Sequence, residues 1–515
     1  MNLRLVVNQF ALLALGLAAL LAGLAAWAGV EWAIGDANEA AATKALAVSA
    51  AAIAAAASAA FRLTRRERAG QVGRREALLL VAVSWLGGAA VAAAPFLLWA
   101  RLAPDAAGHP FANPVNAYFE AMSGLTTTGA TILPDIDLAP RSILLWRAMT
   151  HWLGGLGIVV LFVAVLPSLG AGGKRLFKVE APGPRAEGVH PHVRETARTL
   201  WKIYLGLTLA EVLALRLAGV GWYKAVNHTF ATLATGGFST FDSSIAGFDS
   251  LAVEIIIIAF MLLAGVNFGL YFQLLKGRPR ALLKDTELRV YLAMLLVGTV
   301  LIGMSILGGT LRTTGGEAID DAGLGHSVRY AAFQAVAIQT TTGFATADFN
   351  GWPFLGKAVL LAMMFIGGSA GSTAGGLKVV RVWILFKVLY AELEKAFRPA
   401  VVRSMRIGRM TVDSELRLAT VSYVMAFFLV IAAGAVALML IETASGHAVS
   451  FTTAATATIA SVFNIGPGLH RVGPTGNYAF FTDAGKLILA LLMAVGRLEL
   501  FAIAVLFTPR FWRRT

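Results

Sequence analysis

Long apolar runs alternate with short segments of charged residues along the whole chain. Ten of these runs contain the roughly 20 residues that a helix needs to cross a hydrocarbon core about 30 Å thick. They cover residues 5–30, 41–61, 77–100, 143–169, 200–222, 251–275, 290–309, 354–395, 415–442 and 484–508. Arg4 before the first run is also a feature of signal peptides, but this run exceeds their apolar region of roughly 7–15 residues. The pattern therefore predicts an all-α polytopic membrane protein.

Four shorter segments between the later spans end in stretches rich in threonine and glycine. Their glycines, Gly129, Gly237, Gly343 and Gly466, are separated by 108, 106 and 123 residues. Self-similarity at a near-constant period indicates a repeated structural unit. We expect four pseudo-symmetric repeats of span, pore helix, loop and span around a central pore, preceded by two extra N-terminal spans. The expected boundaries are 1–75 for the N-terminal spans and 76–175, 176–280, 281–405 and 406–515 for the repeats.

Three of the four predicted pore helices have local start signals. Asn113 followed by Pro114 is typical of a capped first turn, and Ser327 and Ser450 are expected to cap the third and fourth helices. Each helix would then end inside the membrane with the negative end of its dipole, about half an elementary charge, directed at the loops. This arrangement favours a cation.

Composition and charge agree with a membrane protein. The chain is 57% hydrophobic and 14% charged, against roughly 25% charged in soluble domains. Its net charge of +14 is divided by topology, with basic segments at 62–75, 174–185, 276–284, 398–409 and 510–514 and acidic ones between them. The positive-inside rule therefore predicts cytoplasmic termini and removes the need for a nucleic-acid partner. The absence of cysteine excludes disulfides and thiolate metal sites.

The four loops carry the candidate ion-binding chemistry. Irregular backbone survives at membrane depth only where it is buried in protein or lines water, and a ring of carbonyl oxygens replaces the hydration shell of an ion. The candidate cation ligands are Thr127, Thr128, Gly129, Thr235, Gly236, Gly237, Thr341, Thr342, Gly343, Asn464, Ile465 and Gly466. A single such loop is more often a packing face of small residues, but four in register favour a selectivity filter.

A glycine-rich interruption of the 354–395 run is the candidate gate. Five glycines lie within ten residues there: Gly367, Gly368, Gly371, Gly375 and Gly376. Each glycine costs a helix about 1 kcal/mol relative to alanine, so we expect the span to be broken. Lys378 follows the interruption. Arg497 lies 13 residues before Arg510, about 20 Å along a continuous helix; at that depth it is expected to face a cavity or a partner and to contact the 367–376 segment.

Several motifs together resemble the TrkH/KtrB potassium-uptake superfamily. Besides the four loops they are HWLGGLG at 151–157, EAPGP at 180–184, GVNF at 265–268 and GGSAGSTAGG at 367–376. The EAPGP motif and the two extra spans favour the TrkH branch. The resemblance implies potassium uptake across a bacterial inner membrane through one pore per subunit of a homodimer. It also implies a gating loop at about 367–378 and regulation by a cytosolic nucleotide-binding ring resembling TrkA.

Two other classes of protein were weighed against this interpretation. A secondary symporter needs a carboxylate relay near the membrane midplane, for which Glu211 and Glu254 are the plausible candidates. A membrane-embedded enzyme needs a polar catalytic constellation, and the sequence contains none. The prediction is therefore a non-enzyme with K⁺ as the transported ion, no organic cofactor in this chain, and membrane lipid around it. Coupling to Na⁺ or H⁺ stays open at this point.

Overall fold

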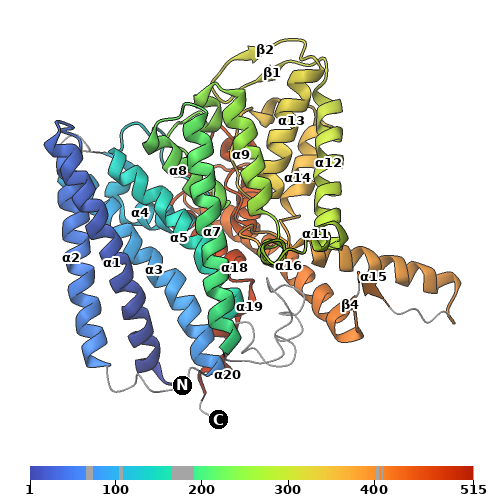
Figure 1. Cartoon of the computed structure of the whole chain (residues 1–515), viewed down its shortest axis with the longest axis horizontal. Helices are drawn as coiled ribbons and strands as arrows, with labels where there is room; N and C mark the ends of the chain where they lie inside the picture. Colours follow the sequence, from blue (N-terminus) through green and yellow to red (C-terminus); the bar gives the residue numbers. More distant parts are fainter. Residues whose placement is uncertain (65–72, 104–107, 165–190, 401–404, 409, 514–515) are drawn as a thin grey trace.

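The computed structural model describes residues 1–64, 73–103, 108–164, 191–400, 405–408 and 410–513. These residues form a bundle of helices with two short β-hairpins (Figure 1). The all-α polytopic fold predicted from the sequence is confirmed. The EAPGP motif at 180–184 and the expected boundary between 175 and 176 lie outside the described residues.

The first two helices stand at one side of the bundle (Figure 1). Helices α1 (Leu3–Ala33) and α2 (Glu39–Leu63) form an antiparallel pair, and both are long and apolar enough to cross a membrane. Small residues such as Ala28, Ala42 and Ala45 are completely buried in the core that these helices share with α3. Both predicted N-terminal spans are therefore present, packed through alanine faces that allow close approach.

A long helix, a shorter helix, a loop and then one helix or a broken pair of helices follow one another four times along the rest of the chain. The first set is α3 (Arg74–Leu102), α4 (Pro114–Leu125) and α5 (Arg141–Ala164); the second is α7 (Pro191–Leu217), α8 (Trp222–Leu233), α9 (Leu251–Ala264) and α10 (Phe268–Leu275). The third is α12 (Thr286–Ile306), α13 (Leu324–Gln339), α14 (Phe354–Met364) and α15 (Val379–Phe397). The fourth is α16 (Ser414–Ala444), α17 (Phe451–Phe463), α18 (Asp483–Arg497) and α19 (Phe501–Ala504).

The remaining elements are short. They are α11 (Arg280–Lys284), α20 (Pro509–Trp512) and the 3₁₀ turns η3 (Pro110–Ala112), η5 (Ser244–Phe248), η6 (Phe349–Gly351), η7 (His470–Val472) and η8 (Val505–Phe507). Strands β1 (Leu311–Arg312) and β2 (Ala318–Ile319) pair antiparallel, as do β3 (Arg406–Ile407) and β4 (Met410–Thr411).

Two of the three predicted helix caps are confirmed. The side chains of Asn113 and Ser450 accept hydrogen bonds from the second or third backbone N–H of their helices. The prediction for Ser327 is wrong, because α13 begins at Leu324 with Gly323 as its N-cap. The Ser327 hydroxyl instead donates to the Ala322 carbonyl from inside the first turns, because an extra turn of helix precedes it.

Three of the expected spans are interrupted. Within the described residues, five helices are long and apolar enough to cross a membrane, or six if the bent pair α9 and α10 counts as one span. This pair is bent by 92° because Asn267 caps a new helix. The 354–395 span is broken between α14 and α15, as predicted. The 484–508 run is not continuous either: Glu499 and Leu500 adopt left-handed conformations directly after α18.

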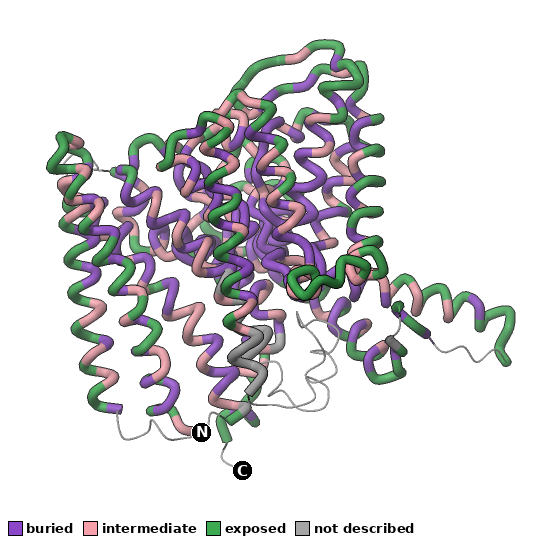
Figure 2. The backbone as a smooth tube through the Cα atoms, viewed as in Figure 1, coloured by how far each residue is buried: buried purple, intermediate pink, exposed green. Residues whose placement is uncertain are grey.

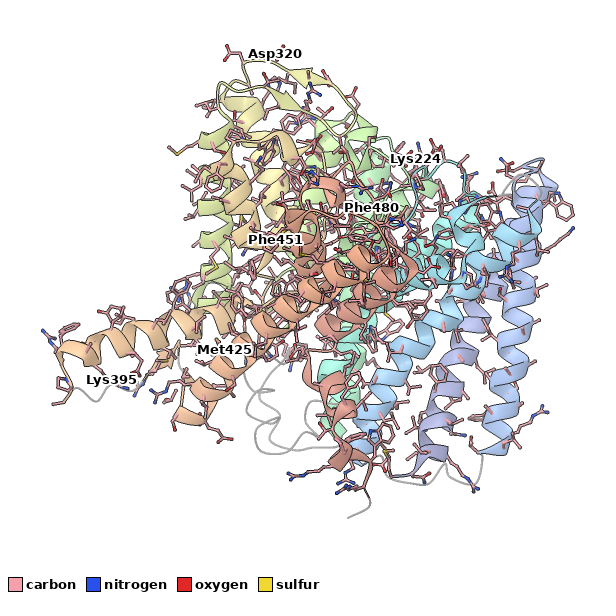
Figure 3. The ribbon with its side chains drawn as sticks, turned by 180° about the vertical axis from the view of Figure 1, so that it is seen from behind. Lys224, Asp320, Lys395, Met425, Phe451 and Phe480 are labelled. Atoms are coloured by element: carbon pink, nitrogen blue, oxygen red, sulfur yellow. The ribbon has the colours of Figure 1, made fainter. Side chains whose placement is uncertain are left out.

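The two chain ends lie at the same end of the bundle (Figure 1). Val6, Leu78, Leu79 and Phe511 form one small apolar cluster there. The β1–β2 hairpin, with Asp320 directly after β2, lies at the opposite end, and α15, which carries Lys395, projects sideways from the bundle (Figure 3). Buried residues gather in the middle, where the short helices end (Figure 2). The fold therefore concentrates its irregular backbone at the centre of the molecule.

Candidate functional site

The four short helices end in the same backbone geometry. A non-glycine residue in the left-handed region follows each helix, at Thr127, Thr235, Thr341 and Asn464, with φ between 53° and 59°. Two residues further on, Gly129, Gly237, Gly343 and Gly466 have φ between 76° and 89°. Left-handed backbone costs a residue with a Cβ about 1–2 kcal/mol, so a conformation that recurs four times is under strong constraint from its surroundings.

The four loops form a closed ring. A Cβ built on Gly129 would lie 2.0 Å from the Gly236 carbonyl oxygen, and one built on Gly237 would lie 1.9 Å from that of Thr342. A Cβ on Gly343 would lie 1.8 Å from the Ile465 carbonyl oxygen, and one on Gly466 would lie 2.8 Å from that of Thr128. Each glycine thus packs on a carbonyl of the next loop, and the fourth loop returns to the first.

One cavity of about 120 Å³ opens onto all four ring glycines, Gly129, Gly237, Gly343 and Gly466. Asp242 and Arg147 also line this cavity. The carboxylate oxygens of Asp242, Asp135 and Asp137 lie within 4.8 Å of one another. Burial, reinforced by the two neighbouring carboxylates, raises the pKa of Asp242 above its ordinary value. This mouth of the ring is therefore lined by a cluster of acidic side chains.

The hydroxyls of the loop threonines are mostly engaged with the protein. The Thr128 hydroxyl lies 2.7 Å from that of Thr126 and accepts from Asn464 Nδ2 at 3.0 Å. The Thr342 hydroxyl lies 2.8 Å from that of Thr340. The hydroxyls of Thr128 and Thr342 are therefore occupied by contacts within the protein.

Helix α5 supports two loops through the HWLGGLG motif. His151 Nδ1 lies 2.8 Å from the Gly124 carbonyl oxygen, and the imidazole packs so closely on Gly236 that a Cβ there would be 2.4 Å from its Cγ. Gly154 faces the Leu125 carbonyl, and Gly155 faces the Ala234 backbone, in each case too closely for a side chain. The motif therefore has a packing reason, since only glycine allows this approach.

The glycine-rich segment after α14 turns back on itself and lies against the ring on the side away from the cavity. Gly367 N donates to the Leu377 carbonyl at 2.8 Å. Gly375 N donates to the Thr341 hydroxyl at 2.7 Å, and a Cβ on Gly375 would lie 2.5 Å from the Phe463 carbonyl oxygen. The segment that the sequence proposed as a gate is thus in direct contact with the third and fourth loops.

Three charged side chains, Arg497, Lys378 and Glu287, hold this segment, and the sequence had already pointed to the first two. Arg497, which is 3% exposed, donates to the Thr373 carbonyl at 2.9 Å and to that of Gly154 at 3.3 Å. The predicted contact between Arg497 and the 367–376 segment is confirmed. The expectation of a continuous helix of about 20 Å between Arg497 and Arg510 is wrong, because α18 ends at Arg497. Lys378 Nζ donates to the Ala374 carbonyl.

Glu287 and Arg381 were missed by sequence reasoning. The Glu287 carboxylate accepts from Ala370 N at 2.8 Å and from Val380 N at 3.1 Å, so it binds both sides of the segment. Arg381 pairs with Glu499 at 2.8 Å. Glu287 lies in the first turn of α12, where an acid is favoured by the helix dipole alone. Its sequence context therefore held no signal of its second role.

One of the two carboxylates that a symporter would need for its relay has a structural role. Both oxygens of Glu254 accept from Arg329 at 2.8 Å, which makes this residue a structural partner between α9 and α13. Glu211 is fully buried on α7 and is the remaining candidate. A single carboxyl does not form a relay.

A polytopic membrane bundle with a closed ring of loops and a charged mouth is the architecture of a cation-translocating protein. The family model for TrkH, described as "Cation transport protein", matches residues 47–514. The chain therefore belongs to the TrkH family of cation transport proteins.

Relatives and a solved structure agree with this assignment. The chain is 39% identical over 451 residues to the Trk system potassium uptake protein TrkH of Salmonella typhimurium, covering 87% of this chain and 88% of that protein. It is 31% identical over 453 residues to the Trk system potassium uptake protein TrkG of Escherichia coli, with 87% and 88% coverage. The crystal structure of the potassium transporter TrkH from Vibrio parahaemolyticus matches with a TM-score of 0.85, 30% identity and full coverage of both chains.

Proposed function

We propose that the protein takes up K⁺ through the ring of four loops. The observation that carries the proposal is the closure of this ring, in which Gly129, Gly237, Gly343 and Gly466 each pack on a carbonyl of the next loop. In this proposal the closed ring holds four sets of carbonyl oxygens around one axis, and such oxygens replace the hydration shell of a potassium ion. The names of the relatives, potassium uptake proteins, support this choice of ion.

In the proposed path K⁺ moves from the acidic mouth into the ring of loops. The carboxylates around Asp242 concentrate cations at the mouth. The ion then sheds its water among the carbonyls near the twelve loop residues named from the sequence, where the negative ends of α4, α8, α13 and α17 also point. The membrane potential supplies roughly 2.3 kcal/mol per charge per 100 mV. K⁺ is cargo in this mechanism, and the proposal includes no organic cofactor.

The segment 367–378 is the proposed gate. It is held against the ring by Thr341 and Arg497 and at its flanks by Glu287. The proposed gating residues are Gly367, Gly368, Gly371, Gly375, Gly376, Lys378 and Arg497. In this proposal the Arg497 guanidinium adds a positive barrier to cation movement, and the barrier lifts when the segment moves.

The proposed setting is the bacterial inner membrane with both termini in the cytoplasm. The basic segments at 62–75, 276–284 and 510–514 support this orientation through the positive-inside rule. We further propose a homodimer of four-repeat subunits and a cytosolic nucleotide-binding ring resembling TrkA as its regulator. The two cytosolic-side elements that connect to the gate, α12 through Glu287 and α15, are the proposed route of regulation.

Uptake of rubidium-86 into potassium-loaded liposomes tests the filter. External K⁺ is expected to block the flux of the wild-type protein and Na⁺ to leave it intact. Gly343→Ser is expected to abolish this discrimination, because a Cβ at this position overlaps the Ile465 carbonyl. Gly325→Ser is the matched control, since this glycine lies on α13, the helix that leads into the Gly343 loop, is exposed and has no atom within 4 Å of its built Cβ.

Either of two results would contradict the proposal. Flux through Gly343→Ser with unchanged discrimination would place ion recognition elsewhere. Flux of the wild-type protein that requires a proton gradient and is lost in Glu211→Gln would favour the symporter instead.

A further inference from the structure

A buried ion pair lies directly behind the first two loops. Glu120 on α4 is completely buried, and Arg147 on α5 is 2% exposed. Arg147 Nε donates to Glu120 Oε1 at 2.6 Å. Burying two charges is costly unless their remaining hydrogen-bonding capacity is satisfied. The partners of both groups therefore indicate what the pair does.

Glu120 binds the first loop just beyond its ring glycine. Its Oε1 also accepts from the Thr131 hydroxyl at 2.9 Å, and its Oε2 accepts from Ile132 N at 2.9 Å. Thr131 follows Gly129 by two residues. The carboxylate thus fixes the segment that leaves the ring, from a helix whose own end forms the ring.

Arg147 binds the second loop at the equivalent place. One terminal nitrogen donates to the Ser239 carbonyl at 3.2 Å, and the guanidinium carbon lies 3.4 Å from the centre of the Phe238 ring. Phe238 and Ser239 follow Gly237 directly. The ion pair consequently connects two consecutive loops of the ring.

The other repeats use neutral groups at the position of Glu120. The residue nine places before the ring glycine is Glu120, His228, Gln334 or Ala457 in the four repeats. His228 Nε2 lies 3.0 Å from the Ser239 hydroxyl, and Gln334 Nε2 lies 3.5 Å from that of Thr346. In the fourth repeat the neighbouring Thr456 accepts from Leu469 N at 3.0 Å. Each short helix thus supports its own loop through a side-chain contact, here called a brace, and the brace of the first repeat is charged.

The charge of this brace has an electrostatic consequence. Arg147 lines the cavity at the mouth of the ring, and a guanidinium remains protonated under all ordinary conditions. A bare positive charge beside a cation path repels the ion strongly in a medium of low dielectric constant. Glu120 neutralises this charge while Arg147 connects the two loops.

We propose that Glu120 and Arg147 form a positioning pair that sets the spacing of the first and second loops and thereby the discrimination between K⁺ and Na⁺. The inference rests on the proposed function, because it assigns a role in that same ring. Rigid spacing matters because carbonyls held apart bind the smaller Na⁺ poorly, whereas loops free to approach each other accommodate it.

The test compares the ratio of K⁺ to Na⁺ inhibition of rubidium-86 uptake in liposomes. Glu120→Gln is expected to lower this ratio by about tenfold, which corresponds to about 1.4 kcal/mol of differential binding. Thr131→Val, which removes a donor to Glu120 and keeps the charges balanced, is expected to lower it less. Glu254→Gln is the matched control, because it breaks another carboxylate–arginine pair between helices and touches no ring loop.

Because the ratio does not depend on the amount of active protein, partial misfolding does not imitate the expected result. An unchanged ratio in Thr131→Val and in Glu120→Gln would overturn the inference, as would an equal loss in Glu254→Gln. If Gly343→Ser loses discrimination and the Glu120 variant keeps it, the inference alone fails. If Gly343→Ser also keeps discrimination, the proposed filter fails with it.

Discussion

At the scale of single residues, the four ring glycines are not equivalent. A Cβ added at Gly129, Gly237 or Gly343 would lie 1.8–2.0 Å from a carbonyl oxygen, whereas at Gly466 the nearest approach is 2.8 Å. All four also have positive φ, so every substitution carries some backbone strain. The tolerance of the ring to a single methyl group should therefore differ from repeat to repeat.

We predict that Gly466→Ala keeps the discrimination between K⁺ and Na⁺ in rubidium-86 flux and that Gly343→Ala loses it. The contact at Gly466 also requires the backbone to shift, but by less than the overlap at Gly343, which displaces the Ile465 carbonyl from the ring. The ratio of K⁺ to Na⁺ inhibition of rubidium-86 flux, with folding checked by thermal unfolding in detergent, measures the difference. Equal loss in the two variants would contradict the ring geometry.

At the scale of elements, breaks in helices create the candidate site. Asn267, the glycines at 367–376 and the left-handed pair Glu499 and Leu500 each end a helix near the centre of the bundle. The freed backbone groups then bind one another across elements: Ser369 N donates to the Gly265 carbonyl, and Phe268 N donates to that of Gly371. These hydrogen bonds satisfy backbone groups that lipid would leave unpaired.

We predict that Arg497→Ala raises basal flux through the protein in the absence of any cytosolic partner. The substitution removes both the hydrogen bond to the Thr373 carbonyl and a positive charge. Glu287→Gln is expected to raise basal flux less, because the amide oxygen still accepts one of the two N–H groups that the carboxylate holds. Rubidium-86 uptake in a transport-deficient cell measures both.

A suitable control is Glu415→Gln, which alters an acid in the first turn of α16 at the same helical position as Glu287 in α12. Basal flux that stays at the wild-type level in Arg497→Ala would remove Arg497 from the gate.

At the scale of the whole molecule, the two ends of the bundle differ in chemistry. Both terminal segments pack together at one end, with Arg510 exposed there, while Asp320 is exposed at the other. The acidic mouth of the ring lies on the loops that follow the short helices, and the gate segment lies on the opposite side of the ring. The molecule is therefore polarised along the axis on which we propose that the ion moves.

We predict that a membrane-impermeant maleimide labels Asp320→Cys in intact cells and labels Arg510→Cys only after permeabilisation. The chain contains no cysteine, so each variant carries a single thiol and the wild-type protein serves as the unlabelled control. The expectation follows from the basic residues at 510–514 and the positive-inside rule. Labelling of Arg510→Cys in intact cells would reverse the proposed orientation.

Sequence alone determined the features that depend on local composition. Apolar run length identified the spans, glycine density located the break after α14, and the near-constant spacing of Thr/Gly loops identified four equivalent segments. Caps at Asn113 and Ser450 followed from side chains that bond their own helix. Each of these features depends either on residues close together in the sequence or on a pattern that repeats along it.

The tertiary structure alone decided which distant groups meet. Closure of the ring joins Gly466 to Thr128, and the brace behind it joins Glu120 to Arg147 and Arg147 to Ser239. Glu287 is an unremarkable helix-start acid until the segment after α14 folds onto it. Such contacts depend on how rigid helices pack, and packing satisfies buried charges and backbone groups with whatever partner lies across the interface. The periodicity of the sequence does not indicate which distant groups become partners.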